Sequence, residues 1–365
     1  PLATASPSAR SRRSCVCCTR LITTSTPSAA ANWDGPAVSR ISKVSVLESQ
    51  RGYDIIGDVH GCALTVERLL EQMGYQKKAG VWRHAERQAL FLGDIIDRGP
   101  RIRESLHLVR DMVEAGSARC IMGNHEFNAL CWATPAPPDS GRAFMREHNE
   151  RHHRLIGDTL DQFAAWPGEW QGFLDWFYEL PLFLDCDEIR LVHACWDDRL
   201  IEPFRAQHPD GCIDRDYLLA AGNWGSAESR TLDRLLRGTD LRLPNGATMT
   251  GTDGFTRASF RTKFWEEAPQ RYGDVVFQPD ALPDAVAALE LSNEQKAALQ
   301  IYQPEDPILF VGHYWQQGQP QPIRPNLACL DYSAVKYGKL VAYRWDGERR
   351  LDSDNFVWVD VPRYA

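Results

Sequence analysis

Short apolar runs alternate with segments of helical spacing over the first part of the chain. Three runs bounded by glycine or polar residues predict buried strands, at 53–56, 89–92 and 119–122. Apolar residues in two intervening segments have the spacing of an amphipathic helix, 62–74 and 103–115, and a further helix is predicted from Glu126. Strands that alternate with helices in this way indicate βαβ units and a parallel sheet.

The rest of the chain is less regular. Residues 140–180 are predicted to be helical and carry aromatic side chains at helical spacing, which favours a core role over a binding surface: Phe163, Trp166, Trp170, Phe173, Trp176, Phe177 and Tyr178. Further strands are predicted at 182–184, 189–193, 308–311, 327–330, 340–345 and 356–359. The stretch 197–305 has weaker periodicity, with helices expected at 226–237 and 292–302, and is interpreted as an insertion or lid.

Polar clusters follow five of the predicted strands. They are Gly57-Asp58-Val59-His60-Gly61, Gly93-Asp94-Ile95-Ile96-Asp97-Arg98-Gly99, Gly123-Asn124-His125-Glu126, Val192-His193 and Gly312-His313. Ligands of open α/β sheets bind at the carboxyl ends of the strands, so these clusters are expected to converge on one place. Glycine lets the backbone turn sharply beside a ligand without side-chain bulk.

The residue types in these clusters predict a site for two metal ions. Carboxylate, amide oxygen and imidazole together suit Mn, Fe or Zn better than Ca or Mg, which prefer oxygen ligands alone. Taken singly, Asp58 or Asp94 could cap a helix, Asn124 could hold a turn, and His193 could be a core histidine. The three glycine-bounded motifs in this order favour the metal site.

These motifs resemble those of the calcineurin-like metallophosphoesterases, in particular the branch that holds the Ser/Thr protein phosphatases and the symmetrical diadenosine tetraphosphate hydrolases. The resemblance extends over residues 53–130, 180–196 and 307–346. It implies an α/β fold of four layers, two mixed β-sheets flanked by helices, with a helical insertion. The domain is expected to span 51–362, with the insertion at about 197–305.

The resemblance also implies a role for each site residue. One metal would be held by Asp58, His60 and the bridging Asp94, and the other by Asp94, Asn124, His193 and His313. His125 corresponds to the general acid, and Asp97 would orient it and raise its pKa. Arg98 would bind the phosphoryl group, because its planar guanidinium matches phosphate geometry.

Three positions depart from the family pattern. Trp315 replaces a second histidine after Gly312-His313, a loss shared by the phosphatase and dinucleotide hydrolase branch. Met122 stands where protein phosphatases place a second phosphate-binding arginine, which favours nucleotide or other small substrates. The segment that begins at Leu330 only partly matches the last motif of the bacterial phosphatases and dinucleotide hydrolases. Asp331 is interpreted as structural rather than catalytic.

Composition limits the classes of partner and the compartment that are expected for this protein. The net charge of −8 argues against a nucleic-acid or membrane-surface partner, since either would favour a basic stripe. The ten cysteines lack regular spacing, and most of them are interpreted as small core residues in a reducing compartment. Residues 1–50 are expected to be a disordered tail or a targeting segment, which makes the protein cytoplasmic, or organellar if the segment is a transit peptide.

The leading hypothesis is hydrolysis of a phosphate ester or anhydride by hydroxide that two divalent metal ions activate. Manganese is favoured, with Fe, Zn, Ni and Co as alternatives, and a nucleotide or other small phosphorylated molecule is the favoured substrate. The alternatives are a Ser/Thr phosphoprotein phosphatase and a metal-binding scaffold without catalysis. The basic stretch 257–263 is either a substrate contact from the insertion or a solvated hairpin.

Overall fold

A six-stranded mixed sheet carries the first three site loops. The computed structural model describes residues 52–186, 188–250, 256–277 and 282–362. The sheet has the strand order β14-β15-β1-β4-β5, with β16 also paired to β15. The strands are β1 (Gly52–Ile56), β4 (Arg87–Phe91), β5 (Ala118–Cys120), β14 (Asp331–Tyr332), β15 (Lys339–Trp345) and β16 (Phe356–Asp360). Strands β1, β4 and β5 are parallel to one another, as predicted, whereas β15 runs antiparallel to β1.

A second, four-stranded sheet carries the other two site loops. Its order is β13-β12-β7-β6, with bounds β6 (Phe183–Cys186), β7 (Ile189–Val192), β12 (Ile308–Val311) and β13 (Leu327–Cys329). Strands β7, β12 and β13 are parallel, and β6 is antiparallel to β7. The main strands of both sheets were therefore predicted in the correct places.

Both sheets are buried on both faces, which explains why their strands read as unbroken apolar runs. In β12, Ile308 and Phe310 point into a core shared with β1, β4 and β15, whereas Leu309 and Val311 point into a second core with the helices. In β4, Leu90 likewise faces the first core and neighbouring side chains face the second. This alternation gives four layers, so the sandwich of two mixed sheets flanked by helices is confirmed.

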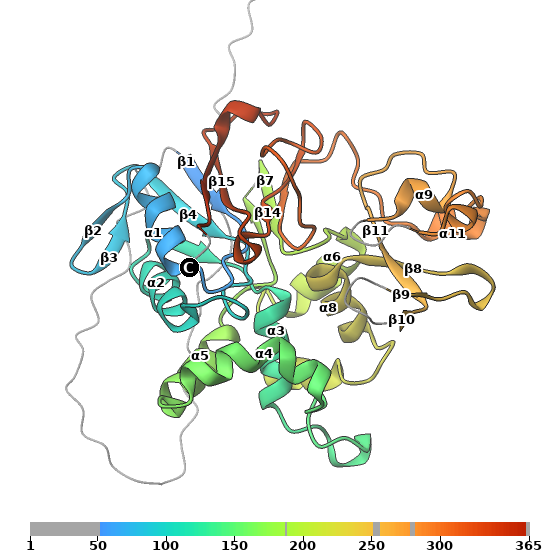
Figure 1. The fold of residues 1–365 in the computed structure, drawn as a ribbon, viewed down its shortest axis with the longest axis horizontal. Coiled ribbons are helices and arrows are strands. Elements are labelled where there is room, and N and C mark those ends of the chain that lie inside the picture. The colour runs from blue at the N-terminus through green and yellow to red at the C-terminus, as the bar shows by residue number, and fades with distance from the viewer. Residues whose placement is uncertain (1–51, 187, 251–255, 278–281, 363–365) are drawn as a thin grey trace, which may run out of the picture.

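Helices α1 (Ala63–Gln72) and α2 (Ile102–Glu114) follow β1 and β4, and α3 (Asn124–Ala133) follows β5. Figure 1 shows α1 and α2 beside the six-stranded sheet, with α3 near the centre of the molecule. The connection from Gly74 to Arg87 forms a hairpin that was not predicted, β2 (Gln76–Lys78) and β3 (Val81–Arg83). Its strands are short and largely polar on the exposed side, so they lack an apolar run.

The predicted helical segment 140–180 contains two helices rather than one long one, α4 (Glu150–Phe163) and α5 (Pro167–Phe177). Residues 141–149 are not helical, because the Asn149 side chain accepts a hydrogen bond from the His152 amide and so begins α4 there. The aromatic side chains are mainly core, as predicted: Phe163, Phe173, Trp176 and Phe177 are buried. Trp166 is the exception, with 46% of its surface exposed.

The segment predicted as an insertion contains both helices and strands. Its helices are α6 (Asp198–Gln207), α7 (Arg215–Ala220), α8 (Ala227–Arg237), α9 (Tyr272–Val275), α10 (Asp284–Ala287) and α11 (Asn293–Ala298). Two antiparallel strand pairs complete it, β8 (Thr239–Arg242) with β11 (Ser259–Thr262) and β9 (Met249–Thr250) with β10 (Thr256–Arg257). A separate small apolar core around Phe260 and Tyr272 packs the strands and α9 to α11, which lie to the right in Figure 1, whereas α6, α7 and α8 pack into the large core.

The predicted helix 292–302 is shorter than expected. Ser292 caps α11, but Leu299 is already extended, because the following chain turns back so that the Tyr302 amide bonds to the Phe264 carbonyl oxygen. The basic stretch 257–263 spans the end of β10 and all of β11, which pair with β9 and β8 and not with each other.

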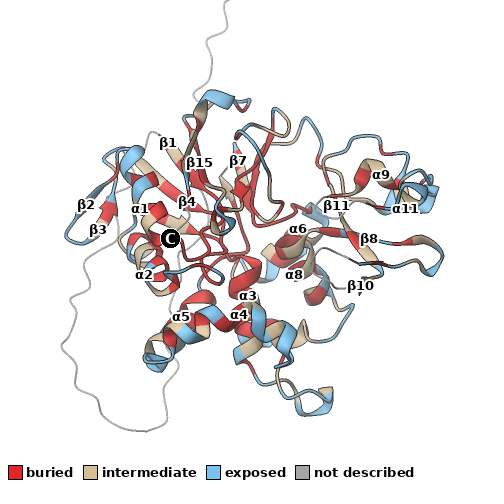
Figure 2. Cartoon of the chain, viewed as in Figure 1, coloured by how far each residue is buried: buried red, intermediate tan, exposed pale blue. Residues whose placement is uncertain are grey.

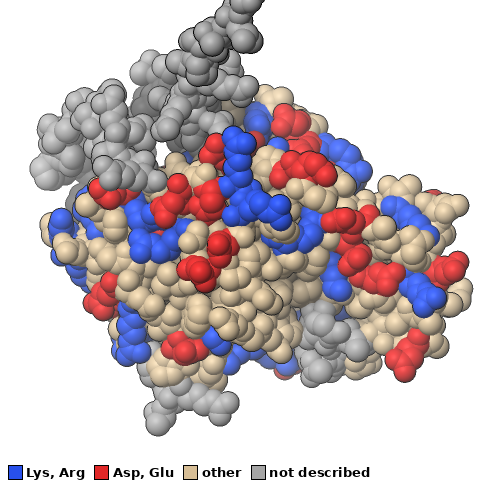
Figure 3. All heavy atoms as spheres, turned by 90° about the horizontal axis from the view of Figure 1, so that it is seen from above, with Lys and Arg blue, Asp and Glu red and all other residues tan. Residues whose placement is uncertain are grey.

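Charges of both signs are interspersed over the face of the molecule that Figure 3 shows. None of the helices in the described ranges has the length and apolar character needed to cross a bilayer. The seven cysteines within those ranges carry free thiols, and five of them are buried. The predicted tail, residues 1–50, lies outside the described residues.

Candidate metal centre

The five site loops leave the carboxyl ends of β1, β4, β5, β7 and β12 and meet at that edge of the two sheets. Figure 2 shows this central region as buried. Among non-glycine residues, His60, Asp94, Asp97, Arg98 and His313 all have positive φ, between 43° and 72°. Such backbone conformations cost energy in residues with a side chain, and they persist where the surroundings impose them, often at functional sites.

Asp94 occupies the middle of the cluster. Its Oδ2 atom lies 3.4 Å from Nε2 of His193, 3.6 Å from Nε2 of His60 and 3.9 Å from Nε2 of His125. Its other oxygen, Oδ1, accepts a hydrogen bond of 3.0 Å from the His125 amide, which fixes the direction of the carboxylate. One buried carboxylate oxygen therefore faces three imidazoles.

Two groups of ligand-type atoms lie close enough together to hold a cation, and both include Asp94. One contains Asp58 and His193, and the other contains His60 and His125. Asp94 is thus common to both groups. Asp58 Oδ2 also accepts a hydrogen bond from the His313 amide at 3.2 Å, which links the first site loop to the loop after β12.

The imidazoles are held so that Nε2 faces the centre of the site. Nδ1 of His60 lies 2.9 Å from the Ile96 carbonyl oxygen, and Nδ1 of His193 lies 2.8 Å from that of Leu92. A carbonyl oxygen can only accept, so each Nδ1 carries a proton and donates it. This arrangement leaves Nε2 as the atom available for a metal, which is the usual support of histidine ligands.

Asn124 and His313 lie beside the ligand group that contains Asp58 and His193. Oδ1 of Asn124 lies 2.6 Å from Nδ1 of His313 and 3.1 Å from Nε2 of His193. Two buried polar atoms nearby, Asp58 Oδ1 and His313 Nε2, form no hydrogen bond. Unsatisfied buried atoms of this kind are costly unless they have a partner, and both are of the type that binds a transition metal. The residues present therefore fit a cation.

The charges around Asp58 and His193 also favour a positively charged group at this place. Burial alone would lower the pKa of His193, but the carboxylates of Asp94 and Asp58 raise it to about 10. Burial raises the pKa of Asp58, and the neighbouring Asp331 carboxylate adds to the effect. Asp331, the first residue of β14, is thus close enough for its charge to act on Asp58.

His125, which belongs to the ligand group of His60, forms a buried pair with Asp97. Nδ1 of His125 lies 2.5 Å from Oδ2 of Asp97, and the other Asp97 oxygen accepts a hydrogen bond from the Thr159 hydroxyl. The orienting contact that the sequence predicted is present. The predicted rise in the pKa of His125 is wrong: burial lowers it to about 3, and burial also raises the pKa of Asp97 to about 7.

Arg98 bridges two imidazoles. Its Nη1 atom lies 3.1 Å from Nε2 of His60, and its Nη2 atom lies 2.9 Å from Nε2 of His125. Guanidinium groups only donate, so both Nε2 atoms accept and both imidazoles are neutral in this arrangement. The guanidinium therefore lies beside the ligand group of His60 and His125, where it can reach a phosphoryl oxygen of a substrate.

Glu126 is a supporting residue to which the sequence analysis gave no role. It is completely buried, and its carboxylate accepts hydrogen bonds from the amides of Gly123, Asp94 and Ile95 at 2.8 to 3.0 Å. A glutamate at the third position of a helix commonly bonds back to the residue before the helix, and that pattern was visible in the sequence. Thr159, which reaches Asp97 from α4, had no such pattern.

Glycine is required where the loops touch the ligands. A Cβ atom on Gly312 would lie 2.1 Å from Asp58 Oδ1, and one on Gly123 would lie 2.3 Å from Asp94 Oδ1. Both distances are far below contact distance, so any larger residue would displace a carboxylate. The glycines of the predicted motifs therefore serve close approach to the ligand oxygens.

The departures from the family pattern also have clear places. Met122 is fully buried in the core shared with the helices, so that position brings no cation to the site. Trp315 is partly buried and packs against the same core. Arg261 of β11 donates to the His313 carbonyl oxygen at 3.4 Å, so the basic stretch also contacts the site loop.

The family model of the calcineurin-like phosphoesterases matches residues 53–235. An asymmetrical bis(5'-nucleosyl)-tetraphosphatase from Oceanobacillus iheyensis is 49% identical over 156 residues, which are 40% of this chain and 58% of the relative. A protein of the same name from a Geobacillus species is 31% identical over 147 residues, 39% of this chain and 55% of the relative.

The chain thus spans little more than half the length of these relatives. Among solved structures, a protein serine/threonine phosphatase from Saccharomyces cerevisiae matches with a TM-score of 0.47 and 12% identity. That match covers 87% of this chain and 82% of the other.

Proposed function

The chain belongs to the calcineurin-like phosphoesterase family, and on that premise we propose that it is a dinuclear metal-dependent hydrolase of phosphate esters or anhydrides. Nucleotides and other small phosphorylated molecules are the favoured substrates. The position of Asp94 is the observation that carries the proposal, since one buried carboxylate belongs to both groups of ligand atoms. Two cations close together need such a bridging carboxylate between them.

The proposed ligands are the six residues that the sequence suggested. Asp94 would be shared, with Asp58 and His60 as further ligands of one cation and Asn124, His193 and His313 as further ligands of the other. A pair of divalent cations held there would polarise phosphoryl oxygens and supply hydroxide at neutral pH. Imidazole, carboxylate and amide ligands favour manganese, iron or zinc, and we propose manganese as the ion to test first.

The chain's own residues would position the phosphoryl group and move a proton. Arg98 now lies on the imidazoles of His60 and His125. Its guanidinium would turn to two phosphoryl oxygens when substrate binds, because a charged acceptor forms a stronger hydrogen bond than a neutral imidazole. Nε2 of His125 would then be free to carry a proton to the leaving oxygen, with Asp97 holding the opposite nitrogen.

Two observations favour small substrates over phosphoproteins. Met122 is buried and provides no second arginine from the third loop. The relatives from Oceanobacillus iheyensis and Geobacillus are named bis(5'-nucleosyl)-tetraphosphatases. Both points support a nucleotide substrate for this chain.

A metal-reconstituted activity screen tests the proposal. Metal-free protein is incubated with Mn, Fe, Zn, Ni or Co and assayed with p-nitrophenyl phosphate, a dinucleoside polyphosphate and a phosphopeptide. We expect hydrolysis of the first two with manganese and little hydrolysis of the phosphopeptide. Failure with every metal and every substrate would overturn the enzyme proposal, whereas preference for the phosphopeptide would favour a phosphoprotein phosphatase.

A further inference from the structure

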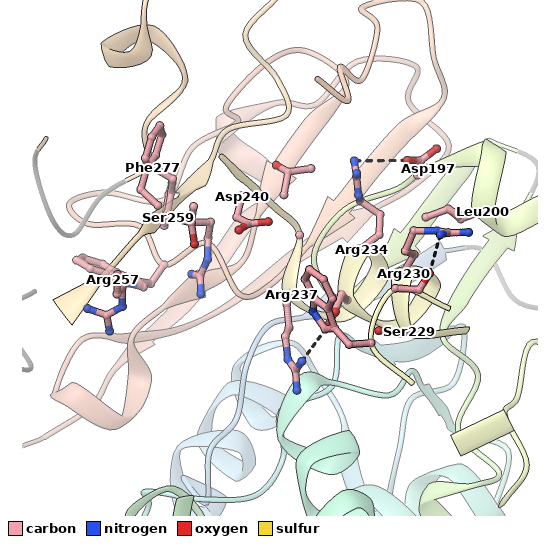
Figure 4. Close-up of a pocket in the computed structure, with 18 of the residues that line it drawn as sticks. Asp197, Leu200, Ser229, Arg230, Arg234, Arg237, Asp240, Arg257, Ser259 and Phe277 are labelled. Atoms are coloured by element: carbon pink, nitrogen blue, oxygen red, sulfur yellow. Dashed lines mark hydrogen bonds and ion pairs between the residues drawn. The ribbon is translucent and has the colours of Figure 1, made fainter. Parts of the chain in front are cut away.

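A large cavity lies beside the metal centre, between α8 and strands β8 and β11 (Figure 4). Its volume is about 1010 Å³. Seven cationic side chains of the described residues line it, against three aspartates: Arg199, Arg230, Arg234, Arg237, Arg257, Arg261 and Lys336, with Asp197, Asp233 and Asp240. The wall is therefore positive in a chain whose net charge is −8. A concave wall of one sign concentrates ligands of the opposite sign.

The cavity is connected to the metal centre at two of its arginines. Nη2 of Arg237 donates to Oδ1 of Asn128 at 2.9 Å, and Asn128 lies one turn after Asn124 on α3. At the other edge, Nη1 of Arg261 donates to the carbonyl oxygen of His313 at 3.4 Å. An anion that touches both a metal site and this cavity would pass these two guanidinium groups.

A second arginine, Arg146, bonds to the same asparagine. Nη1 of Arg146 donates to Oδ1 of Asn128 at 2.8 Å, so two guanidinium groups share one carboxamide oxygen. Within the described part of the chain, Arg146 forms no ion pair with a carboxylate. Burial, and next to it the charge of Arg237, lowers the pKa of Arg146 to about 10. Two like charges held this close favour an anion between them.

We propose that this cavity is the subsite for the distal phosphate groups of a polyphosphorylated substrate, with Arg237 and Arg261 at the junction with the metal centre. The ligand class is a phosphoanhydride chain, as in nucleoside and dinucleoside polyphosphates. A monoester with a single phosphate would fill the metal centre and leave the cavity without a ligand group. The inference rests on the proposed function, because it assigns to that reaction the part of the substrate that is not cleaved.

The substitution Arg237→Gln tests the subsite, and Arg110→Gln is its matched control. Each arginine pairs with an acidic residue four positions away on its own helix, and each lies over a phenylalanine ring. Their side chains are also similarly exposed, 40% for Arg237 and 33% for Arg110. Only Arg237 lines the cavity.

The first readout is the ratio of kcat/KM for diadenosine tetraphosphate to kcat/KM for p-nitrophenyl phosphate. We expect Arg237→Gln to lower this ratio about tenfold or more, the effect of losing one charge-assisted contact to phosphate. Arg261→Gln should lower it in the same direction, which keeps the test valid if one variant folds poorly. Arg110→Gln should leave both activities unchanged.

The second readout does not require hydrolysis. Calorimetry measures the binding of inorganic tripolyphosphate to the metal-free protein, and Arg237→Gln is expected to weaken it about fivefold or more. If no substrate is hydrolysed, the proposed function fails while this binding still decides the subsite. A substrate ratio or a tripolyphosphate affinity that Arg237→Gln leaves at the wild-type value would overturn the subsite, as would an equal loss in Arg110→Gln.

Discussion

The imidazole of His125 and the carboxylate of Asp97 form a buried pair in which Nδ1 and Oδ2 are 2.5 Å apart. Asp97 receives a second hydrogen bond from Thr159, and His125 receives one from Arg98. The pair is thus fixed from both ends. The Nε2 atom of His125 faces Asp94, which places an atom able to take up a proton beside the proposed metal centre.

Substitution of His125 by asparagine should slow turnover about 100-fold or more, in line with the usual contribution of general acid catalysis. The change removes the imidazole Nε2 that would carry the proton. Metal content, measured by mass spectrometry on the same samples, should stay near the wild-type value because Asp94, His60 and His193 remain. Wild-type turnover in a metal-loaded His125→Asn protein would exclude His125 from the mechanism.

The free energy of unfolding of the Asp97→Asn protein should depend on pH differently from that of the wild type. Burial raises the pKa of Asp97 from 3.8 to about 7, so the folded metal-free protein keeps this proton where the unfolded chain releases it. The associated stability is present below the unfolded pKa and is lost as pH rises through the folded value. The lowered pKa of His125 acts in the opposite direction and is common to both proteins.

Between about pH 5 and about pH 8, Asp97→Asn should therefore gain about 3 kcal/mol of unfolding free energy relative to wild type. Urea unfolding of the two metal-free proteins at both pH values measures the difference. An equal pH dependence of the two proteins over this range would mean that Asp97 is already ionised in the folded protein at pH 5.

Replacement of Glu126 by glutamine should destabilise the site loops. The carboxylate of Glu126 now accepts hydrogen bonds from backbone N–H groups. In the variant the side-chain NH₂ group would face some of these N–H groups, so at least one buried donor loses its partner. The expected cost is about 1 to 3 kcal/mol. Urea unfolding measures it, with Glu104→Gln as the control because that side chain is exposed and its ion pair lies on the surface. Equal stability of the Glu126→Gln protein and wild type would remove the proposed support.

The substitution Gly312→Ala should weaken metal binding about 10-fold to 100-fold, the range seen when groups that orient metal ligands are changed. The new Cβ would lie 2.1 Å from Asp58 Oδ1 and would push that carboxylate away. Gly168→Ala is the matched control, since a Cβ there meets nothing within 4 Å. Manganese titration of the metal-free proteins gives the affinities, and equal values for the two variants would contradict the close packing.

Much of the fold was predictable because both sheets are buried on both faces. Runs such as 308–311 then consist only of apolar residues and stand out from the chain. The hairpin β2–β3 and the strands of the insertion were not predicted, since they are short and partly polar. Local capping decided other boundaries: Asn149 begins α4 later than helical spacing suggested.

The candidate site was predictable where ligand residues follow strands directly, as Asp58, Asp94 and His193 do. Supporting contacts from distant elements were not. Thr159 of α4 bonds to Asp97, and Arg237 of α8 bonds to Asn128 beside the site, but the spacing of these helices says nothing about either target. The pKa of His125 was predicted in the wrong direction, because pairing with Asp97 was considered without the burial of the imidazole.

The number of metal ions that the chain binds tests the central claim most directly. Metal-free protein is dialysed against manganese, and bound metal and hydrolysis of p-nitrophenyl phosphate are measured in the same samples. We predict two ions per chain, with activity appearing as the second ion binds, and loss of both in Asp94→Asn because that carboxylate belongs to both ligand groups. Full activity with one bound ion, or two tightly bound ions in Asp94→Asn, would contradict a dinuclear site bridged by Asp94.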